Sequence, residues 1–257
     1  MAMNARIVGN GEITLVLSHG FGTSQEIWEY VIPELSRRYK LLLFDWSFSS
    51  AADSQSAATD ISYAGLANDL ISLLDEMKMK GVVFIGHSLA GMVGCLASVH
   101  RPELFSHLVL VAASPRYMNS EEYQGGFEPS KIQDMLSSIE ADFQSWADSF
   151  ATLVLGKNYS NPLWKYLATL KAMNPKTALA VAKMAFLGDQ RPLLEQVELP
   201  CTIIQCTNDI AMPTSVGYYM ESKIKGKTTL EMVEAEGHFP HVTSPEIFIK
   251  VIDKILL

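Results

Sequence analysis

Short apolar runs of four or five residues recur along the chain and indicate its architecture. Most of these runs are rich in β-branched side chains, which is typical of strands that are covered on both faces of a sheet. The sequence predicts strands at Thr14–Ser18, Lys40–Phe44, Val82–Ile85, Leu108–Val111, Thr202–Gln205 and Thr229–Val233.

Between most of these strands, apolar residues return every three or four positions, which is the spacing of an amphipathic helix. Alternation of strands and helices indicates an α/β protein with a mostly parallel sheet, right-handed crossovers and flanking helices. The predicted helices are Ile27–Ser36, Tyr63–Met77, Ser88–Arg101, Pro213–Lys223 and Pro245–Leu257.

One connection, residues 112–200, is far longer than the dozen or so residues that a crossover needs. Within it, apolar residues step by three or four from Ile132 to Val154, and Asn174-Pro175 is typical of the start of a helix. We therefore expect an inserted helical lid of about four helices that roofs a pocket. The expected division is a lid over residues 114–199 and a core over residues 1–113 and 200–257.

Composition and charge narrow the function classes. The net charge of −8 and the isoelectric point near 5.3 argue against nucleic acid or an anionic membrane as partner, because both bind basic faces. Cys95, Cys201 and Cys206 lie in apolar contexts without metal-ligand spacing, so neither a metal nor another cofactor is expected. The odd cysteine count and an N-terminus without an apolar core predict a cytoplasmic or nuclear protein. A monomer is the default expectation.

The segment VVFIGHSLAGMVG around Ser88 carries the clearest chemical signal. No charged Asp, Glu, Lys or Arg occurs from Gly81 to His100, yet polar and small residues interrupt the middle, where a membrane-spanning helix would be most apolar. Instead, a β-branched run changes to helical spacing at the serine. This strand–turn–helix, with the small residues Gly86 and Ala90 beside the serine, resembles the nucleophile elbow of the α/β-hydrolase fold.

A serine hydroxyl becomes an effective nucleophile only when a base takes its proton. In the α/β-hydrolase fold an acid and then a histidine follow the serine along the chain. Asp209 follows the fifth predicted strand and His238 the sixth, whereas Asp45 precedes the serine and has the wrong order. His241 is a rival base three residues after His238, closer to the final helix. We predict Ser88, Asp209 and His238 as the catalytic triad.

An oxyanion hole needs two backbone N–H groups aimed at the developing negative charge. The amide of Leu89, directly after the serine, is the first predicted donor. The second is predicted to be the amide of Phe21, in the loop SHGFGTS that follows the first strand.

The sequence resembles the plant strigolactone and karrikin receptors. The motifs that carry this resemblance are SHGFG, GHS, LVAASPRYMNSEEYQGGFE, TND and GHFPH. The stretch from Ser114 to Glu128 is the most specific of these signatures, and the resemblance spans nearly the whole chain. It implies an α/β-hydrolase with a lid of four helices and the triad named above. The family's aromatic pocket positions, together with the tyrosine of SPRY, fall on Phe21, Tyr117, Phe127, Trp146, Phe150 and Phe186.

The resemblance also implies a ligand and a partner. The ligand would be a butenolide whose ring carbonyl is attacked by Ser88 with His238 as base, in a slow reaction that can leave a ligand fragment on the histidine. The partner would be a leucine-rich-repeat F-box protein that docks on the lid. The loop FDWSFSSAADS after the second strand lacks the glycine typical of the receptors, and with TNDIAMP it resembles the branch called DWARF-FOURTEEN-LIKE TWO.

Three functions fit these residues. The first is a slow serine hydrolase or receptor for a butenolide hormone, and the second is an ordinary carboxylesterase that clears small esters without a partner. The third is a binding module in which the triad only shapes the pocket. The turnover rate separates the first two functions, and the effect of Ser88→Ala on hydrolysis separates both from the third.

Overall fold

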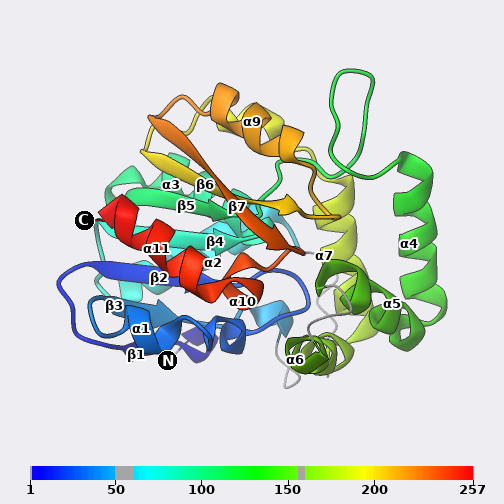
Figure 1. Cartoon of the computed structure of the whole chain (residues 1–257), viewed down its shortest axis with the longest axis horizontal. Helices are drawn as coiled ribbons and strands as arrows, with labels where there is room; N and C mark the ends of the chain where they lie inside the picture. The colour runs from blue at the N-terminus through cyan, green and yellow to red at the C-terminus, as the bar shows by residue number, and fades with distance from the viewer. Residues whose placement is uncertain (1, 50–60, 156–159, 257) are drawn as a thin grey trace.

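A sheet of seven strands runs through the computed structural model, which describes residues 2–49, 61–155 and 160–256 (Figure 1). The strands lie in the order β1-β3-β2-β4-β5-β6-β7, and every neighbouring pair is parallel except β1 and β3. The predicted mostly parallel sheet is therefore confirmed. Its strands are β1 (Arg6–Val8), β2 (Thr14–Ser18), β3 (Lys40–Leu43), β4 (Val82–His87), β5 (Phe105–Val111), β6 (Cys201–Asn208) and β7 (Thr228–Glu236).

Strand β1 is absent from the sequence prediction. It is only three residues long, it is mostly exposed, and it pairs antiparallel with β3 at the edge of the sheet, with Arg6 opposite Leu43. A strand with one neighbour and solvent on its other side does not need the continuous apolar run that marks a buried strand.

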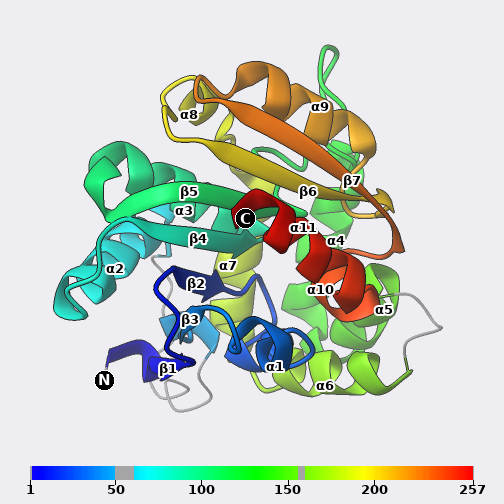
Figure 2. The same ribbon diagram turned by 60° about the vertical axis from the view of Figure 1, so that its left-hand side comes forward.

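Helices cover both faces of the sheet (Figure 2). Alternate strand residues explain this arrangement, because Val16 and Phe84 belong to one apolar cluster and Leu17 and Ile85 to the other. No helix in the described ranges is both long and apolar enough to cross a membrane. The first cluster packs on α2 (Tyr63–Glu76), α3 (Leu89–His100) and α9 (Thr214–Lys223), and the second on α1 (Ile32–Leu35) and α11 (Pro245–Leu256).

The continuous helix predicted over Ile27–Ser36 is wrong. Two short turns, η2 (Gln25–Trp28) and α1, stand in its place. Pro33 explains the break, because proline has no backbone N–H to donate within a helix and is tolerated only in the first turn.

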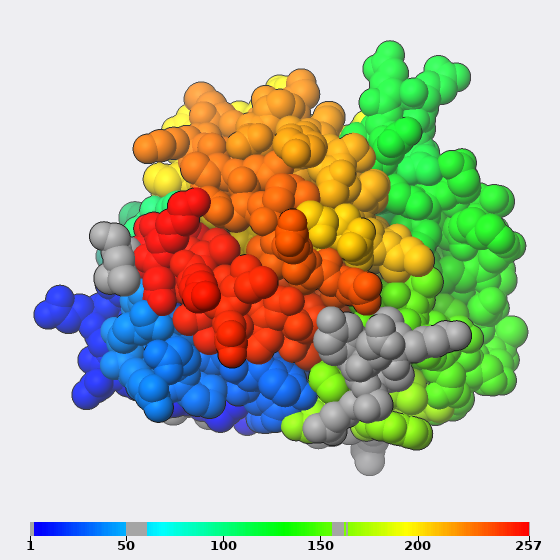
Figure 3. All heavy atoms as spheres, in the orientation of Figure 1, coloured from blue at the N-terminus to red at the C-terminus, as the bar shows by residue number. Residues whose placement is uncertain are grey.

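The predicted helical lid is inserted between β5 and β6. It lies along one side of the core, and the loop that joins β5 to α4 stands out from the surface beside it (Figures 1 and 3). A further short helix, α8 (Arg191–Leu194), leads back to the core. The lid helices are α4 (Pro129–Ala141), α5 (Phe143–Leu155), α6 (Ser160–Lys171) and α7 (Pro175–Leu187).

The apolar spacing from Ile132 to Val154 covers two helices and not one. Asp142 has non-helical dihedral angles (φ −153°, ψ 87°) and separates α4 from α5. Its carboxylate accepts hydrogen bonds from the Ser145 amide (3.1 Å) and the Ser145 hydroxyl (2.6 Å), which caps the start of α5.

The loop after β3, on which the resemblance to the DWARF-FOURTEEN-LIKE TWO branch partly rests, is described only in its first half. Residues 44–49 include the short turn η3 (Ser47–Ser49), with Trp46 fully buried. Residues 50–54 of FDWSFSSAADS lie outside the described ranges.

Candidate active site

Ser88 occupies a tight turn between β4 and α3. Its φ of 58° and ψ of −126° are unusual for a residue with a side chain, and its amide donates to the Val111 carbonyl (2.8 Å) at the end of β5. Gly86 is required beside it, because a Cβ there would lie 2.8 Å from the Ala90 carbonyl. The predicted nucleophile elbow is thus present, and it lifts the serine hydroxyl above the carboxyl ends of the strands.

Ser88, His238 and Asp209 form one line of hydrogen bonds. The Ser88 Oγ lies 2.9 Å from His238 Nε2, and His238 Nδ1 lies 2.7 Å from the Asp209 Oδ2. Each of the three residues is less than a tenth exposed. Because the carboxylate can only accept at Nδ1, it holds the proton there and leaves Nε2 free to take the serine proton.

The two loops that carry the acid and the base are held by backbone hydrogen bonds. The second carboxylate oxygen of Asp209 accepts from the amides of Ala211 (2.8 Å) and Met212 (3.2 Å), which fixes its direction. The His238 amide donates to the carbonyl of Val154 (2.8 Å) in lid helix α5. The base is therefore positioned by the lid as well as by the core.

The alternative base His241 and the alternative acid Asp45 take no part in this line of hydrogen bonds. His241 is fully buried and stacks on Trp28, with ring centroids 4.2 Å apart. Burial lowers the pKa of His241 to about 3, so the ring stays neutral, and neither of its nitrogens has a partner among the described residues. Asp45 accepts from the Gln25 amide (2.7 Å) and from Asn4 (2.8 Å), near the amino end of the chain.

Both predicted oxyanion donors border the same cavity as Ser88. Leu89 is the first residue of α3, so its amide is one of those that a helix leaves without an internal partner. Phe21 lies in the loop after β2, which approaches the elbow so closely that a Cβ on Gly20 would lie 3.0 Å from the Ser88 Cβ.

A cavity opens over Ser88 between the core and the lid. Its wall is mainly apolar, and apart from the serine its polar side chains are two histidines and two tyrosines. Its lining is formed by Phe21, His87, Ser88, Leu89, Tyr117, Phe150, Val154, Tyr166, Ala185, Phe186, Ala211, His238 and Phe239.

Four of the six predicted pocket residues, namely Phe21, Tyr117, Phe150 and Phe186, line this cavity. The other two form the layer behind it. Trp146 stacks on Phe150 (centroids 4.8 Å apart), and Phe127 meets the edge of Phe186 (5.9 Å). Both contact rings of the wall and are not themselves among the residues that line the cavity.

Two tyrosines add contacts that the sequence did not predict. The Tyr117 hydroxyl lies 3.0 Å from the Ser88 Oγ, so it is a second hydrogen-bond partner of the nucleophile. Burial raises the pKa of Tyr117 above its ordinary value and keeps the phenol neutral. Tyr166, on α6, was not predicted as a pocket residue, since its place in the wall depends on how the lid packs on the core.

A metal centre is not formed by the described part of the chain. Residues 2–49, 61–155 and 160–256 contain no group of three or more His, Cys, Asp or Glu side chains arranged to hold a metal ion.

Comparison with known proteins agrees with this geometry. The family model for the alpha/beta hydrolase fold matches residues 13–245. The chain belongs to the α/β-hydrolase family.

Within the family, two similar proteins are from plants. Strigolactone esterase RMS3 from Pisum sativum is 38% identical over 250 residues, which is 95% of this chain and 92% of the relative. The karrikin insensitive 2 receptor CA from Petunia hybrida is 37% identical over 254 residues, or 98% of this chain and 94% of the relative. The resemblance to the strigolactone and karrikin receptor family is thereby confirmed, while the assignment to one branch stays a prediction.

Solved structures of this α/β-hydrolase fold are also similar. A hydrolase from Oleispira antarctica superposes with a TM-score of 0.92 at 31% identity, and covers 98% of this chain and 95% of its own. The enol-lactonase from Burkholderia xenovorans LB400 superposes with a TM-score of 0.84 at 18% identity, which shows a shared fold.

Proposed function

We propose that this protein is a serine hydrolase that binds a small apolar butenolide and slowly hydrolyses its ester or lactone bond, in the perception of a plant hormone. The observation that carries the proposal is the Ser88–His238–Asp209 line of hydrogen bonds at the base of an apolar cavity. The names of two similar proteins, a strigolactone esterase and a karrikin insensitive 2 receptor, support the choice of ligand class.

The proposed mechanism starts with proton transfer from the Ser88 hydroxyl to His238 Nε2 as the oxygen attacks the carbonyl carbon. Asp209 stabilises the imidazolium that forms, and the amides of Phe21 and Leu89 stabilise the oxyanion. Collapse of this intermediate releases the alcohol or enol oxygen, which takes the proton from His238. Water then attacks the acyl-enzyme with the same histidine as base.

The wall of the cavity sets the class of ligand. Apart from the triad, its surface is formed by aromatic rings, aliphatic side chains and neutral phenols, and His87 is kept uncharged because burial lowers its pKa. An anionic or strongly hydrated ligand would lose its water without gaining an ionic partner. A small, neutral, largely apolar ester or lactone meets no such penalty.

We also propose that the lid is the surface from which a leucine-rich-repeat F-box protein reads the state of the ligand. Support comes from the direct hydrogen bond between the His238 amide and the Val154 carbonyl, which joins the catalytic base to lid helix α5. Trp164, on α6 of the lid, is 70% exposed and offers a large aromatic contact to a partner.

The test is hydrolysis of a fluorogenic butenolide by the wild-type protein and by Ser88→Ala. Loss of the nucleophile is expected to lower kcat/KM by about 10⁴-fold or more. Ser98→Ala is the matched control, since Ser98 is buried in α3, the helix that follows Ser88, and among the described residues its hydroxyl donates only to the Cys95 carbonyl (2.7 Å). Hydrolysis by Ser88→Ala at the wild-type rate would overturn the mechanism.

An ordinary carboxylesterase would use the same residues, so the rate of turnover distinguishes the two functions. A protein that hydrolyses simple aryl esters in many cycles per second is an ordinary carboxylesterase. A protein that stalls after about one cycle on a butenolide acts as a receptor.

A further inference from the structure

The catalytic cavity contains two tyrosine hydroxyls with different surroundings. The Tyr117 hydroxyl is engaged with the Ser88 Oγ. Tyr166 lines the same cavity and is only 2% exposed, yet its hydroxyl has no hydrogen-bond partner among the described residues. It is also beyond hydrogen-bond distance of the triad. Among the hydroxyls of this mainly apolar wall, that of Tyr166 is thus the one without a partner among the described residues.

Packing fixes the position of this hydroxyl. The Tyr166 ring packs on Phe239, with centroids 5.2 Å apart. The loop of the predicted oxyanion hole is also close, because a Cβ on Gly22 would lie 3.0 Å from the Tyr166 hydroxyl and 2.7 Å from Leu170. Gly22 has a φ of +73°, so a side chain there is disfavoured by the backbone as well as by space. The hydroxyl therefore stays next to that loop.

The phenol is a permanent donor. Burial raises the pKa of Tyr166 well above its ordinary value, so the phenol is protonated at neutral pH. When a ligand fills the cavity and expels water, a donor without a partner is costly, and a donor that meets an acceptor on the ligand is favourable.

We propose that Tyr166 is a specificity-determining residue whose hydroxyl donates to an ether or carbonyl oxygen of the ligand other than the carbonyl attacked by Ser88. This inference rests on the proposed function and deepens it. The preferred substrates are esters or lactones that carry a second, uncharged oxygen acceptor, and analogues with a methylene in that place are selected against.

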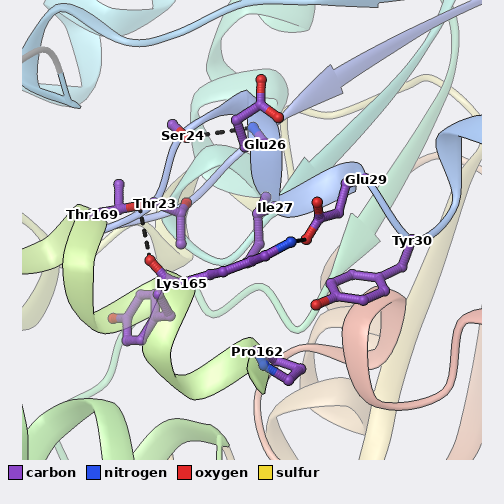
Figure 4. A pocket seen from close by; sticks show the side chains of 10 residues that line it. Thr23, Ser24, Glu26, Ile27, Glu29, Tyr30, Pro162, Lys165 and Thr169 are labelled. Carbon is purple, nitrogen blue, oxygen red and sulfur yellow. Dashed lines mark hydrogen bonds and ion pairs between the residues drawn. The ribbon is translucent and has the colours of Figure 1, made fainter. Parts of the chain in front are cut away.

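The surroundings of Tyr166 favour a neutral acceptor. Tyr166 also borders a surface cleft between η2 and α6 (Figure 4), so the second oxygen lies at the side of the cavity that adjoins this cleft. The charges there are already paired, because the Lys165 ammonium reaches across to the Glu29 carboxylate and lies 5.8 Å from the centre of the Tyr30 ring. Because Lys165 is already paired with Glu29, it offers no free cation to an anionic ligand. A neutral oxygen acceptor does not need one.

The experiment compares 4-nitrophenyl hexanoate with three analogues in which an ether oxygen replaces the methylene at position 3, 4 or 5 of the acyl chain. For each ether the readout is the ratio of its kcat/KM to that of hexanoate, so that intrinsic reactivity cancels between variants. In Tyr166→Phe this ratio is expected to fall about tenfold for at least one ether. Tyr63→Phe, a buried tyrosine outside the cavity, is the matched control and keeps the wild-type ratios.

Unchanged ratios for all three ethers in Tyr166→Phe would overturn the inference and leave the proposed function standing. An equal loss for all four esters would also overturn it, because that result indicates a role in oxyanion stabilisation or folding instead of specificity. Failure of the proposed function looks different, since Ser88→Ala would then hydrolyse all four esters as fast as the wild type.

Discussion

At the scale of single residues, the site depends on a strained serine that three neighbours hold in place. Ser88 keeps a positive φ because its amide is bonded to Val111 and its hydroxyl to both His238 and Tyr117. The sequence predicted the triad because each member lies within two residues of the end of a strand. It did not predict the contacts of Tyr117 and Tyr166, because these depend on packing between segments far apart in the chain.

Removing the Tyr117 hydroxyl tests its role beside the nucleophile. Tyr117→Phe is expected to lower kcat/KM about 3- to 10-fold, the worth of one hydrogen bond to a neutral group, since His238 still activates the serine. Steady-state kinetics on a fluorogenic butenolide provide the measurement. A loss as large as that of Ser88→Ala would contradict this and make the phenol a catalytic residue in its own right.

The buried His241 makes stability depend on pH. Its pKa of about 3 in the folded protein lies below the ordinary value of 6.5, so the unfolded chain binds more protons and stability falls as the pH drops from about 6.5 towards 3. Between pH 7 and pH 5 this one residue accounts for a loss of about 2 kcal/mol.

His241→Phe, which keeps an aromatic ring against Trp28, removes that titration. Urea unfolding at pH 7 and pH 5 is expected to show a loss of stability smaller by about 2 kcal/mol in the variant than in the wild type. An equal loss in both proteins would mean that His241 accepts a proton in the folded state.

At the scale of elements, two breaks in helical pattern show where sequence reasoning was limited. Pro33 divides the predicted helix Ile27–Ser36 into two turns, and Asp142 divides the run from Ile132 to Val154 into α4 and α5. In the second case the apolar spacing continues across the break, so periodicity alone cannot detect it. The cap depends on the orientation of one side chain, since the Asp142 carboxylate accepts from the Ser145 amide.

Asp142→Ala removes this cap and leaves the Ser145 amide without its partner. The free energy of unfolding is expected to fall by about 1 kcal/mol, and the Tm by about 2–4 °C for a chain of this size. Thermal unfolding followed by circular dichroism measures the shift. Asp134→Ala, an exposed acid within α4, is the control and is expected to leave the Tm within about 1 °C, whereas a Tm of Asp142→Ala equal to that of the control would contradict a capping role.

At the scale of the whole molecule, the two ends of the lid are bonded to each other where the chain leaves the core and where it returns. Arg116, just after β5, pairs with Asp189, just before α8, at 2.6 Å, and the Gln190 amide donates to the Pro115 carbonyl (2.7 Å). The long insertion was predicted from the length between two strands. The contacts between the two ends of the insertion were not predicted, because they join residues that are far apart in sequence.

Asp189→Asn weakens this closure. Arg191 and then Arg116 hold the pKa of Asp189 at about 2, so its carboxylate is ionised at neutral pH, but partial exposure limits the pair to about 1 kcal/mol or less. Amide exchange in α4–α7 is expected to be up to about fivefold faster, with β4 and β5 unchanged. Glu198→Gln, which breaks an exposed pair with Lys225, is the control, and equal exchange in the lid of both variants would contradict the role of Asp189.

Covalent catalysis by Ser88 and His238 is tested most directly by intact-protein mass spectrometry after incubation with a butenolide panel. We expect a mass increase that equals a ligand acyl fragment, localised by peptide mapping to Ser88 or His238 and absent from Ser88→Ala. Cleavage of the butenolide by Ser88→Ala at the wild-type rate, with no adduct on the wild-type protein, would contradict it.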